Sequence, residues 1–307
     1  MAVEQSKIPN PDVNVKEESL PCYQCGMCSG SCPAARLDKY FNPRRMVVHS
    51  SLGTSKVPAK NKNIWLCAGC YCCSHICPND VKVAEIVAEI REEAVDAGNV
   101  PLLIDEKKCI GCANCEYACP EDAIKVDVGA MVAKVDPALC RSCGSCAVEC
   151  PAFAISYTNF DDAQLKKAVK DALDKLPEEG PKIIAFLCNW CAYSGAESSM
   201  TPYPNVAAVN LLCTGRLDPL LVYSAFQSGA DGVFIGGCPP GRCFYKFNNT
   251  RANKRAEKIK KRIEEIGLEP ERLRMDFIAV NEGETFSDSL DKFTEEIKKI
   301  GKSPLKR

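Results

Sequence analysis

The sequence predicts a multidomain chain: a helical first domain, a small α+β middle domain and a C-terminal α/β domain with a small parallel sheet. Three observations support this fold class. The cysteine phrase C-x2-C-x2-C-x3-C-P occurs four times in the first half of the chain. Only the last two copies are flanked by short apolar stretches of strand length, as expected for an internal duplication. Beyond residue 180, continuous apolar runs alternate with helical patterns, which is typical of a parallel sheet covered on both faces.

The four cysteine motifs are named first to fourth in chain order. Their cysteines are Cys22, Cys25, Cys28 and Cys32; Cys67, Cys70, Cys73 and Cys77; Cys109, Cys112, Cys115 and Cys119; and Cys140, Cys143, Cys146 and Cys150. Bacterial-type ferredoxins bind [4Fe–4S] clusters with this spacing: three cysteines wrap one cluster, and the fourth ligates the other cluster of a pair. The sequence therefore predicts four [4Fe–4S] clusters in two pairs. It also predicts crossed ligands: Cys32 joins the second motif and Cys77 the first, while Cys119 joins the fourth and Cys150 the third.

Composition excludes several function classes for the chain of 307 residues. Disulfides do not require this repeated spacing, so the 22 cysteines indicate metal binding rather than a secreted, disulfide-rich fold. The two histidines, His49 and His75, disfavour a histidine-ligated metal centre or a haem. A net charge of −1 provides no general attraction for nucleic acid. Neither a secretory signal nor an apolar run of about 20 residues is present, so a soluble, cytoplasmic protein is expected.

The motifs divide the chain as follows. Residues 1–19 are predicted to form a flexible arm, and 20–100 a helical iron–sulfur domain whose helices begin near Pro43 and after Pro78, the second with Gly98 as its C-terminal cap. Residues 101–159 are predicted to form an α+β bacterial-type ferredoxin domain with two [4Fe–4S] clusters. A helix and linker at 160–180 lead to an α/β domain at 181–307, with strands predicted at 182–188, 205–213, 231–238 and 272–280, and helices at 216–230, 248–267 and 287–301.

Three of these predicted strands end in a cysteine, namely Cys188, Cys213 and Cys238. The carboxyl ends of parallel strands share one edge of a sheet, where ligands bind, so the three thiols should converge there with Cys191 and Cys243. Five cysteines are enough for a [2Fe–2S] cluster with one to spare. Zinc held by four thiolates is an alternative from spacing alone, because both sites use tetrahedral sulfur. Cys72 lies outside every motif and is interpreted as a small buried hydrophobic residue.

Nearly the whole chain resembles known families. The stretches CYQCGMCSGSCP, NPRRMVVHSSLG and IWLCAGCYCCSHICP resemble the small, two-cluster electron-carrying subunit of heterodisulfide reductase, and residues 101–158 resemble a two-[4Fe–4S] ferredoxin insert. The stretches CNWCAYSGA, LLCTGRLDP and GGCPPGRCFY are similar to the delta subunit of methyl-viologen-reducing, F420-non-reducing hydrogenase. This resemblance implies a [2Fe–2S] cluster and electron transfer between a hydrogenase or formate dehydrogenase and the flavin (FAD) subunit of a heterodisulfide reductase.

The chain departs from the enzymes that this resemblance involves. It lacks a G-x-G-x-x-G phosphate loop, and it lacks the doubled CCG motifs of the catalytic subunit of heterodisulfide reductase. We therefore expect an electron-transfer subunit of an oxidoreductase complex, with an electron-bifurcating complex as one candidate, and no catalytic residues in this chain. A stand-alone thiol or disulfide reductase using the spare C-terminal cysteine is the alternative. A nucleic-acid binder using RANKRAEKIKKR is disfavoured, because acidic residues interrupt the basic ones and no aromatic residue lies among them.

Overall fold

The computed structural model describes residues 16–38, 40–199 and 202–305. The chain forms two compact units, Met1–Val100 and Pro101–Arg307, and each is described by itself. Most of the predicted arm at 1–19 lies outside the described residues. Its last part, however, is packed: Lys16 pairs with Glu89 and Glu93, and its backbone N–H donates to the carbonyl oxygen of Ser50. The prediction of a flexible arm is therefore wrong for residues 16–19, because two carboxylates fix the lysine.

The regular secondary structure of the first unit is helical in its described residues, as predicted. Its longest helix, α5, is amphipathic. The buried apolar side chains of one helical face are Val83, Ile86, Val87, Ile90 and Ala94. Gly98 follows the helix with a φ of +75°. This face packs against α2 and α3. The helices are α1 (Met27–Gly30), α2 (Pro43–Ser51), α3 (Lys56–Ala59), α4 (Cys72–His75) and α5 (Val83–Asp96), with 3₁₀ helices at Glu17–Ser19, Pro33–Arg36 and Lys62–Leu66.

The second unit begins with the duplicated α+β part. Each copy of the duplication supplies a strand before its cysteine turn and a strand after it. The first and last strands pair antiparallel, and so do the two middle strands. The elements are β1 (Leu102–Ile104), α6 (Asn114–Ala118), β2 (Ile124–Asp127), β3 (Val132–Val135), α7 (Ser145–Val148) and β4 (Ile155–Tyr157).

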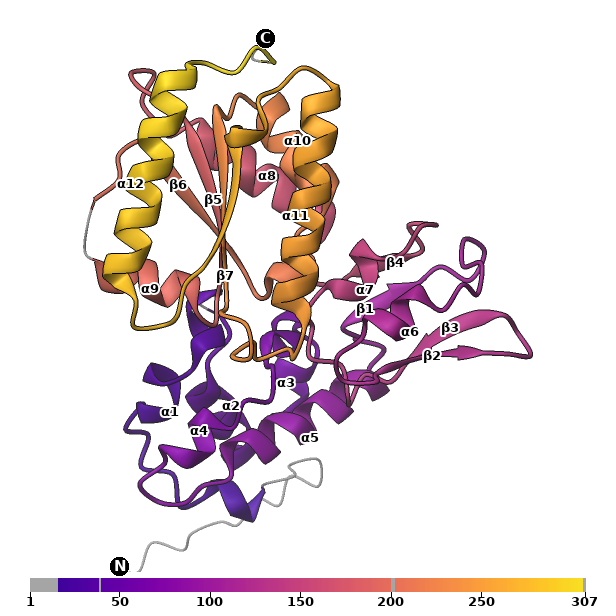
Figure 1. Ribbon diagram of the computed structural model, residues 1–307. Helices are drawn as coiled ribbons and strands as arrows, with labels where there is room; N and C mark the ends of the chain where they lie inside the picture. The colour runs from indigo at the N-terminus through magenta and orange to yellow at the C-terminus, as the bar shows by residue number, and fades with distance from the viewer. Residues whose placement is uncertain (1–15, 39, 200–201, 306–307) are drawn as a thin grey trace, which may run out of the picture. The chain divides into compact units, whose positions relative to one another are not determined.

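A parallel sheet of four strands forms the centre of the C-terminal part (Figure 1). The order across the sheet is β6-β5-β7-β8, and every pair is parallel. The central strands β5 and β7 are buried along their whole length, as their continuous apolar sequences predict. The strands are β5 (Ile183–Cys188), β6 (Val206–Leu211), β7 (Gly232–Gly237) and β8 (Leu273–Phe277).

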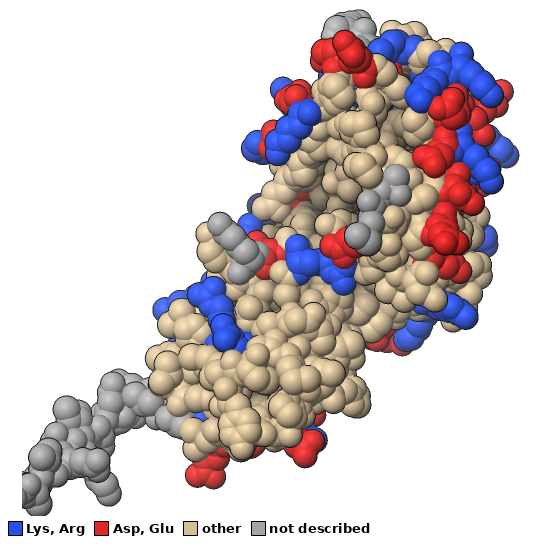
Figure 2. All heavy atoms as spheres, turned by 90° about the vertical axis from the view of Figure 1, so that its left-hand side faces the viewer, with Lys and Arg blue, Asp and Glu red and all other residues tan. Residues whose placement is uncertain are grey.

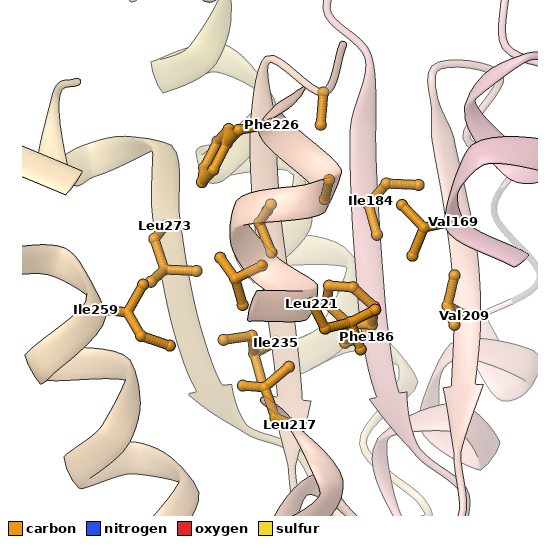
Figure 3. Packing of buried hydrophobic residues seen from close by; sticks show 14 of the residues in the cluster. Val169, Ile184, Phe186, Val209, Leu217, Leu221, Phe226, Ile235, Ile259 and Leu273 are labelled. Atoms are coloured by element: carbon orange, nitrogen blue, oxygen red, sulfur yellow. The ribbon is translucent and has the colours of Figure 1, made fainter. Parts of the chain in front are cut away.

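Helices cover both faces of this sheet. One face is covered by α8, α10 and α11, and the other by α9 and α12. Figure 3 shows Val169 of α8, Phe186 of β5 and Leu221 of α10 packing within the first of these layers. The helices are α8 (Asp162–Leu173), α9 (Ala192–Ser199), α10 (Pro219–Gln227), α11 (Asn248–Glu265) and α12 (Gly283–Ile300), with 3₁₀ helices at Thr214–Arg216 and Pro270–Arg272.

Helix α8 is not part of a linker. A capping box of Asp161 and Gln164 starts it, and its Leu165, Val169 and Leu173 are buried in the core of the α/β part. The sequence predicts the helix but assigns it to a connecting segment. Because this face is buried, α8 belongs to the helical layer that covers one face of the parallel sheet.

The surface agrees with the balanced charge of the sequence. On the face that Figure 2 shows, acidic and basic side chains are interspersed over the α/β part, and the first unit presents a broad area without charge. Among the helices of the described ranges, none is both long and apolar enough to cross a membrane.

Candidate iron–sulfur sites

The four cysteine turns share one backbone conformation. In each turn the residues immediately before and after the second cysteine have positive φ values between +53° and +84°, and a short helix follows. These pairs are Gln24 and Gly26, Gly69 and Tyr71, Gly111 and Ala113, and Ser142 and Gly144. Each turn thus places one glycine and one non-glycine residue in the left-handed region. This conformation costs free energy for the non-glycine residue. The four motifs therefore form one kind of loop.

The thiols of the third motif surround a cavity together with one cysteine from the fourth. Cys109, Cys112, Cys115 and Cys150 all line this small cavity. The remaining lining is mainly apolar. Burial raises the pKa of Cys115 to about 11, so its thiol stays protonated until a cation replaces the proton. Four thiols around an apolar cavity fit a [4Fe–4S] cluster.

The thiols of the fourth motif are grouped with Cys119 in the same crossed manner. Cys143 and Cys146 both interact electrostatically with Cys140 and with Cys119 of the third motif. The thiols of Cys140, Cys143 and Cys146 are buried, and burial raises the pKa of Cys143 to about 12. The hydroxyl group of Tyr157 lies 2.8 Å from the sulfur of Cys146. The structure therefore places Cys150 with the third motif and Cys119 with the fourth, and crossed ligation of the clusters stays a prediction.

The first two motifs show half of this exchange directly. Cys32 of the first motif interacts with Cys67, and Cys73 interacts with Cys67, Cys32 and Cys70. Cys28 interacts with Cys22 and Cys25. The predicted partnership of Cys77 with the first motif stays a prediction, although two residues after Cys77 the Asn79 side chain donates to the carbonyl oxygen of Pro21, beside Cys22.

Cys72 is exposed, so its interpretation as a buried hydrophobic residue is wrong. It lies at the first position of α4, between two motif cysteines, and interacts with Cys70.

Backbone N–H groups donate to several motif sulfurs. Ala133 donates to Cys109 at 3.4 Å, and Ala123 donates to Cys119 at 3.2 Å. Ala154 donates to Cys150 at 3.4 Å. Hydrogen bonds of this kind raise cluster potentials, since they stabilise negative charge on sulfur. From the sequence, the backbone N–H groups of the glycine-bearing turns (Gly26, Gly69, Gly111 and Gly144) are the expected donors to sulfur. In these three bonds the donors are instead alanines outside the turns.

The five C-terminal cysteines converge at one edge of the parallel sheet, as predicted. The Sγ atoms of Cys188 and Cys238 are 3.4 Å apart. Cys238 also contacts Cys191 and Cys243, and Cys243 contacts Cys213. Strand β5, which ends in Cys188, has β6 on one side and β7 on the other, and this reversal of strand order is where open α/β sheets bind ligands.

The thiols of this site lie in different electrostatic environments. Burial raises the pKa of Cys213 well above its usual value, whereas hydrogen bonding from neighbouring thiols lowers the pKa of Cys243. Trp190 stacks on Phe244 with ring centroids 3.8 Å apart, and Tyr245 packs edge-on against both rings. Aromatic residues thus flank the site, while the thiols themselves are soft ligands suited to iron or zinc.

The α+β part and the α/β part of the second unit are in direct contact beside this site. Arg255 of α11 donates to Glu149 at 2.5 Å and to the carbonyl oxygen of Leu217 at 2.9 Å. The hydroxyl group of Tyr245 donates to the carbonyl oxygen of Arg141 at 3.1 Å. The fourth motif is therefore held against the part of the chain that carries the C-terminal cysteine site.

Comparisons with known proteins match three separate parts of the chain. The family described as methyl-viologen-reducing hydrogenase, delta subunit, matches residues 183–301, and two 4Fe-4S dicluster domains match residues 18–81 and 108–154. The vhc iron-sulfur subunit of an F420-non-reducing hydrogenase from Methanococcus voltae is 38% identical over 130 residues, which cover 41% of this chain and 90% of that protein. The chain belongs to the hydrogenase delta-subunit family. The part of this delta-subunit homologue that precedes residue 183 carries the [4Fe–4S] domains.

Other relatives match different shares of this delta-subunit homologue. One subunit of the ferredoxin:CoB-CoM heterodisulfide reductase from Methanosarcina mazei is 39% identical over 160 residues, 50% of this chain. The match spans only 20% of that relative. One subunit of the H2/formate:CoB-CoM heterodisulfide, ferredoxin reductase from Methanococcus maripaludis is 44% identical over 79 residues, 26% of this chain and 42% of that relative. The chain is therefore an iron–sulfur electron-transfer protein related to both heterodisulfide reductase and hydrogenase subunits.

Proposed function

We propose that this chain is a cytoplasmic electron-transfer subunit that links a hydrogenase- or dehydrogenase-type partner to a flavin-containing, electron-bifurcating complex of the heterodisulfide reductase type. The observation that carries the proposal is the contact between the fourth cysteine motif and the C-terminal cysteine site. Two separate thiol sites held against one another within a compact unit are what an electron relay requires. Clusters bound there would supply one-electron carriers, and the protein sets their spacing and potential.

Four [4Fe–4S] clusters are assigned to the sixteen motif cysteines with crossed ligands. In the second unit, Cys150 completes the set of the third motif and Cys119 completes the set of the fourth. The cavity lined by Cys109, Cys112, Cys115 and Cys150 supports this assignment. In the first unit, Cys32 belongs with the second motif, and Cys77 is assigned to the first by analogy.

A [2Fe–2S] cluster is assigned to four of the five C-terminal cysteines: Cys188, Cys191, Cys213, Cys238 and Cys243. Their convergence at the carboxyl edge of the sheet supports this assignment, because thiolates alone can complete the ligand set of such a cluster. Iron and zinc analysis of the purified chain distinguishes the cluster from a zinc ion at the same thiols. Single Cys→Ser variants of the five would identify the dispensable one, which keeps its cluster when replaced.

Partner subunits are inferred from the relatives and from the surface of the first unit. Tyr23 and Met27, inside the first motif, are 78% and 45% exposed, and Tyr71, inside the second, is 45% exposed. Such exposed apolar side chains around a redox site are typical of a docking surface for another protein. We assign this surface to a redox partner and the C-terminal part to the FAD subunit of the complex, with no nucleic acid as partner.

A second candidate function is a stand-alone thiol or disulfide oxidoreductase. The observation that favours it is the fifth cysteine at a site where four are enough for a cluster. Cys191 and Cys243 are the partly exposed members of the group and are therefore the accessible thiols. This function requires turnover of a disulfide substrate by the isolated chain, which an electron-transfer subunit lacks.

Metal analysis of the anaerobically purified chain tests the proposal. Four [4Fe–4S] clusters and one [2Fe–2S] cluster predict about eighteen iron atoms per chain. Low-temperature EPR of the reduced protein should show both cluster types. A preparation dominated by zinc, or one with disulfide reductase turnover equal to that of the complete complex, contradicts it.

A further inference from the structure

The side chain of Asn248 lies between a thiol of the fourth motif and a thiol of the C-terminal site. Asn248 is the first residue of α11 and is completely buried. Its Nδ2 atom lies 3.6 Å from the sulfur of Cys213, and its side chain also lies close enough to Cys143 to lower the pKa of that thiol. An amide nitrogen carries two N–H donors, so one side chain can reach both sulfurs.

Two glycines allow the two cysteine loops to approach this amide. A Cβ atom on Gly215 would lie 2.8 Å from Nδ2 of Asn248. A Cβ atom on Gly144, next to Cys143, would lie 2.4 Å from Cδ of Arg216. Both distances are shorter than real side-chain contacts, so a larger residue at either position would push the loops apart. The two glycines thus keep the loops close enough for one asparagine side chain to reach both.

The hydrogen bonding of Asn248 is incomplete in another respect. Its Oδ1 atom is buried and has no hydrogen-bond partner in the described part of the chain. A buried polar atom without a partner costs free energy, so an apolar side chain of the same size would suit this position better if packing alone mattered. The N–H donors toward the two sulfurs are therefore the feature that distinguishes asparagine here.

We propose that Asn248 is a positioning residue that couples the cluster of Cys119, Cys140, Cys143 and Cys146 to the C-terminal centre. The proposal rests on the function proposed above. One electron leaves one centre as the other gains one, with no bond formed or broken and no proton moved. Because a hydrogen bond to sulfur stabilises the more negative, reduced form, the amide raises the potentials of both centres together. A shared donor of this kind shifts the two potentials in the same direction, so it can raise both centres without opening a large gap between them.

The test replaces Asn248 by leucine in the full chain, purified anaerobically with its clusters. Leucine keeps the volume and removes both donors. Potentiometric titration followed by EPR reads the midpoint potential of each centre separately. Losing one hydrogen bond to each sulfur should change the equilibrium constant for reduction by about tenfold at both centres, with both potentials lowered. Transfer between the centres after a rapid reductant pulse should also slow.

Asn249→Leu is the matched control. Asn249 is the next residue of α11 and is equally buried, but its side chain donates to the carbonyl oxygens of Cys238 and Pro239. This variant should leave the potential of the fourth-motif cluster unchanged. If Asn248→Leu does not fold, Asn248→Asp keeps the shape, replaces the donors by a carboxylate, and should lower both potentials further.

The outcomes separate this inference from the proposed function. A variant that carries its full iron content and keeps the wild-type potentials at both centres overturns the role of Asn248 and leaves the electron-transfer function standing. An equal shift of the fourth-motif potential in Asn249→Leu also overturns it, because the effect would then be structural. Wild-type protein without iron–sulfur clusters would overturn the proposed function itself.

Discussion

Replacement of Arg255 by methionine should destabilise the second unit, mainly where α11 packs on the loop that follows β6. The guanidinium group is almost buried, with its side chain 9% exposed, and donates to the carbonyl oxygens of Gly215 and Leu217 and to Glu149. A hydrogen bond from a charged donor contributes about 1.5–3 kcal/mol. The bond to Glu149 contributes less, about 0–1 kcal/mol, because that carboxylate is 39% exposed. Methionine fills the volume of the arginine stem, so we expect a loss of roughly 3–5 kcal/mol.

Anaerobic thermal unfolding of the iron-loaded chain measures this loss. For a unit of this size each kcal/mol lowers the midpoint by about 2–4 °C, so Arg255→Met should lower it by on the order of 10 °C. The control Glu149→Gln removes only the exposed partner and should shift the midpoint by at most about 4 °C. Equal shifts in the two variants would refute the reasoning, since the bonds to the loop of Cys213 would then contribute nothing.

Three further predictions follow from the site and the core. Cys119→Ser should remove the fourth-motif cluster, about four iron atoms, and leave the third-motif cluster EPR signal; loss of the cluster of Cys109 alone would contradict the crossed ligands. Gly144→Ala should cost about 2–4 kcal/mol of unfolding free energy for two reasons: the new Cβ would lie 2.4 Å from a carbon of the Arg216 side chain, and alanine is strained at a φ of +83°. Gly26→Ala, with a φ of +84° and open space around the Cβ, should cost only about 1–2 kcal/mol, and equal costs would argue against the overlap. Leu165→Ala should cost about 2–5 kcal/mol in denaturant unfolding, whereas a loss below about 1 kcal/mol would mean that α8 is not part of the core.

The sequence predicts most of the fold because the regularly spaced apolar residues of its helices and strands are the residues that the structure buries. The apolar positions of α5 are one helical face, and the continuous apolar runs of β5 and β7 are the two fully buried strands. The convergence of the C-terminal cysteines follows from strand direction alone, since three parallel strands lead into cysteines. These features depend on neighbours in the chain or on one topological rule.

The features that the sequence does not reveal depend on contacts between distant residues. Helix α8 has the pattern of any amphipathic helix, and only the structure shows that its apolar face packs on the sheet. Helix α9 has a weak pattern and is not predicted. Asn248 begins a strongly basic stretch, whose pattern indicates a solvated helix rather than a buried contact. Its position at the start of a helix, after the last C-terminal cysteine, is the one signal that could have pointed to it.

The predicted exchange of last cysteines between the third and fourth motifs has a consequence for how such a fold can arise. A fragment that holds only the first copy of the duplication, from about residue 101 to a point between Cys119 and Cys140, would contain one complete motif, and yet with crossed ligands it could not supply all four ligands of one cluster. Two such fragments would have to associate, at a rate that depends on their concentration. Tandem duplication in one chain gives the second copy an effective concentration on the order of millimolar, whatever the amount of protein in the cell. The duplication thus makes cluster assembly an intramolecular process that does not depend on how much of the protein is made.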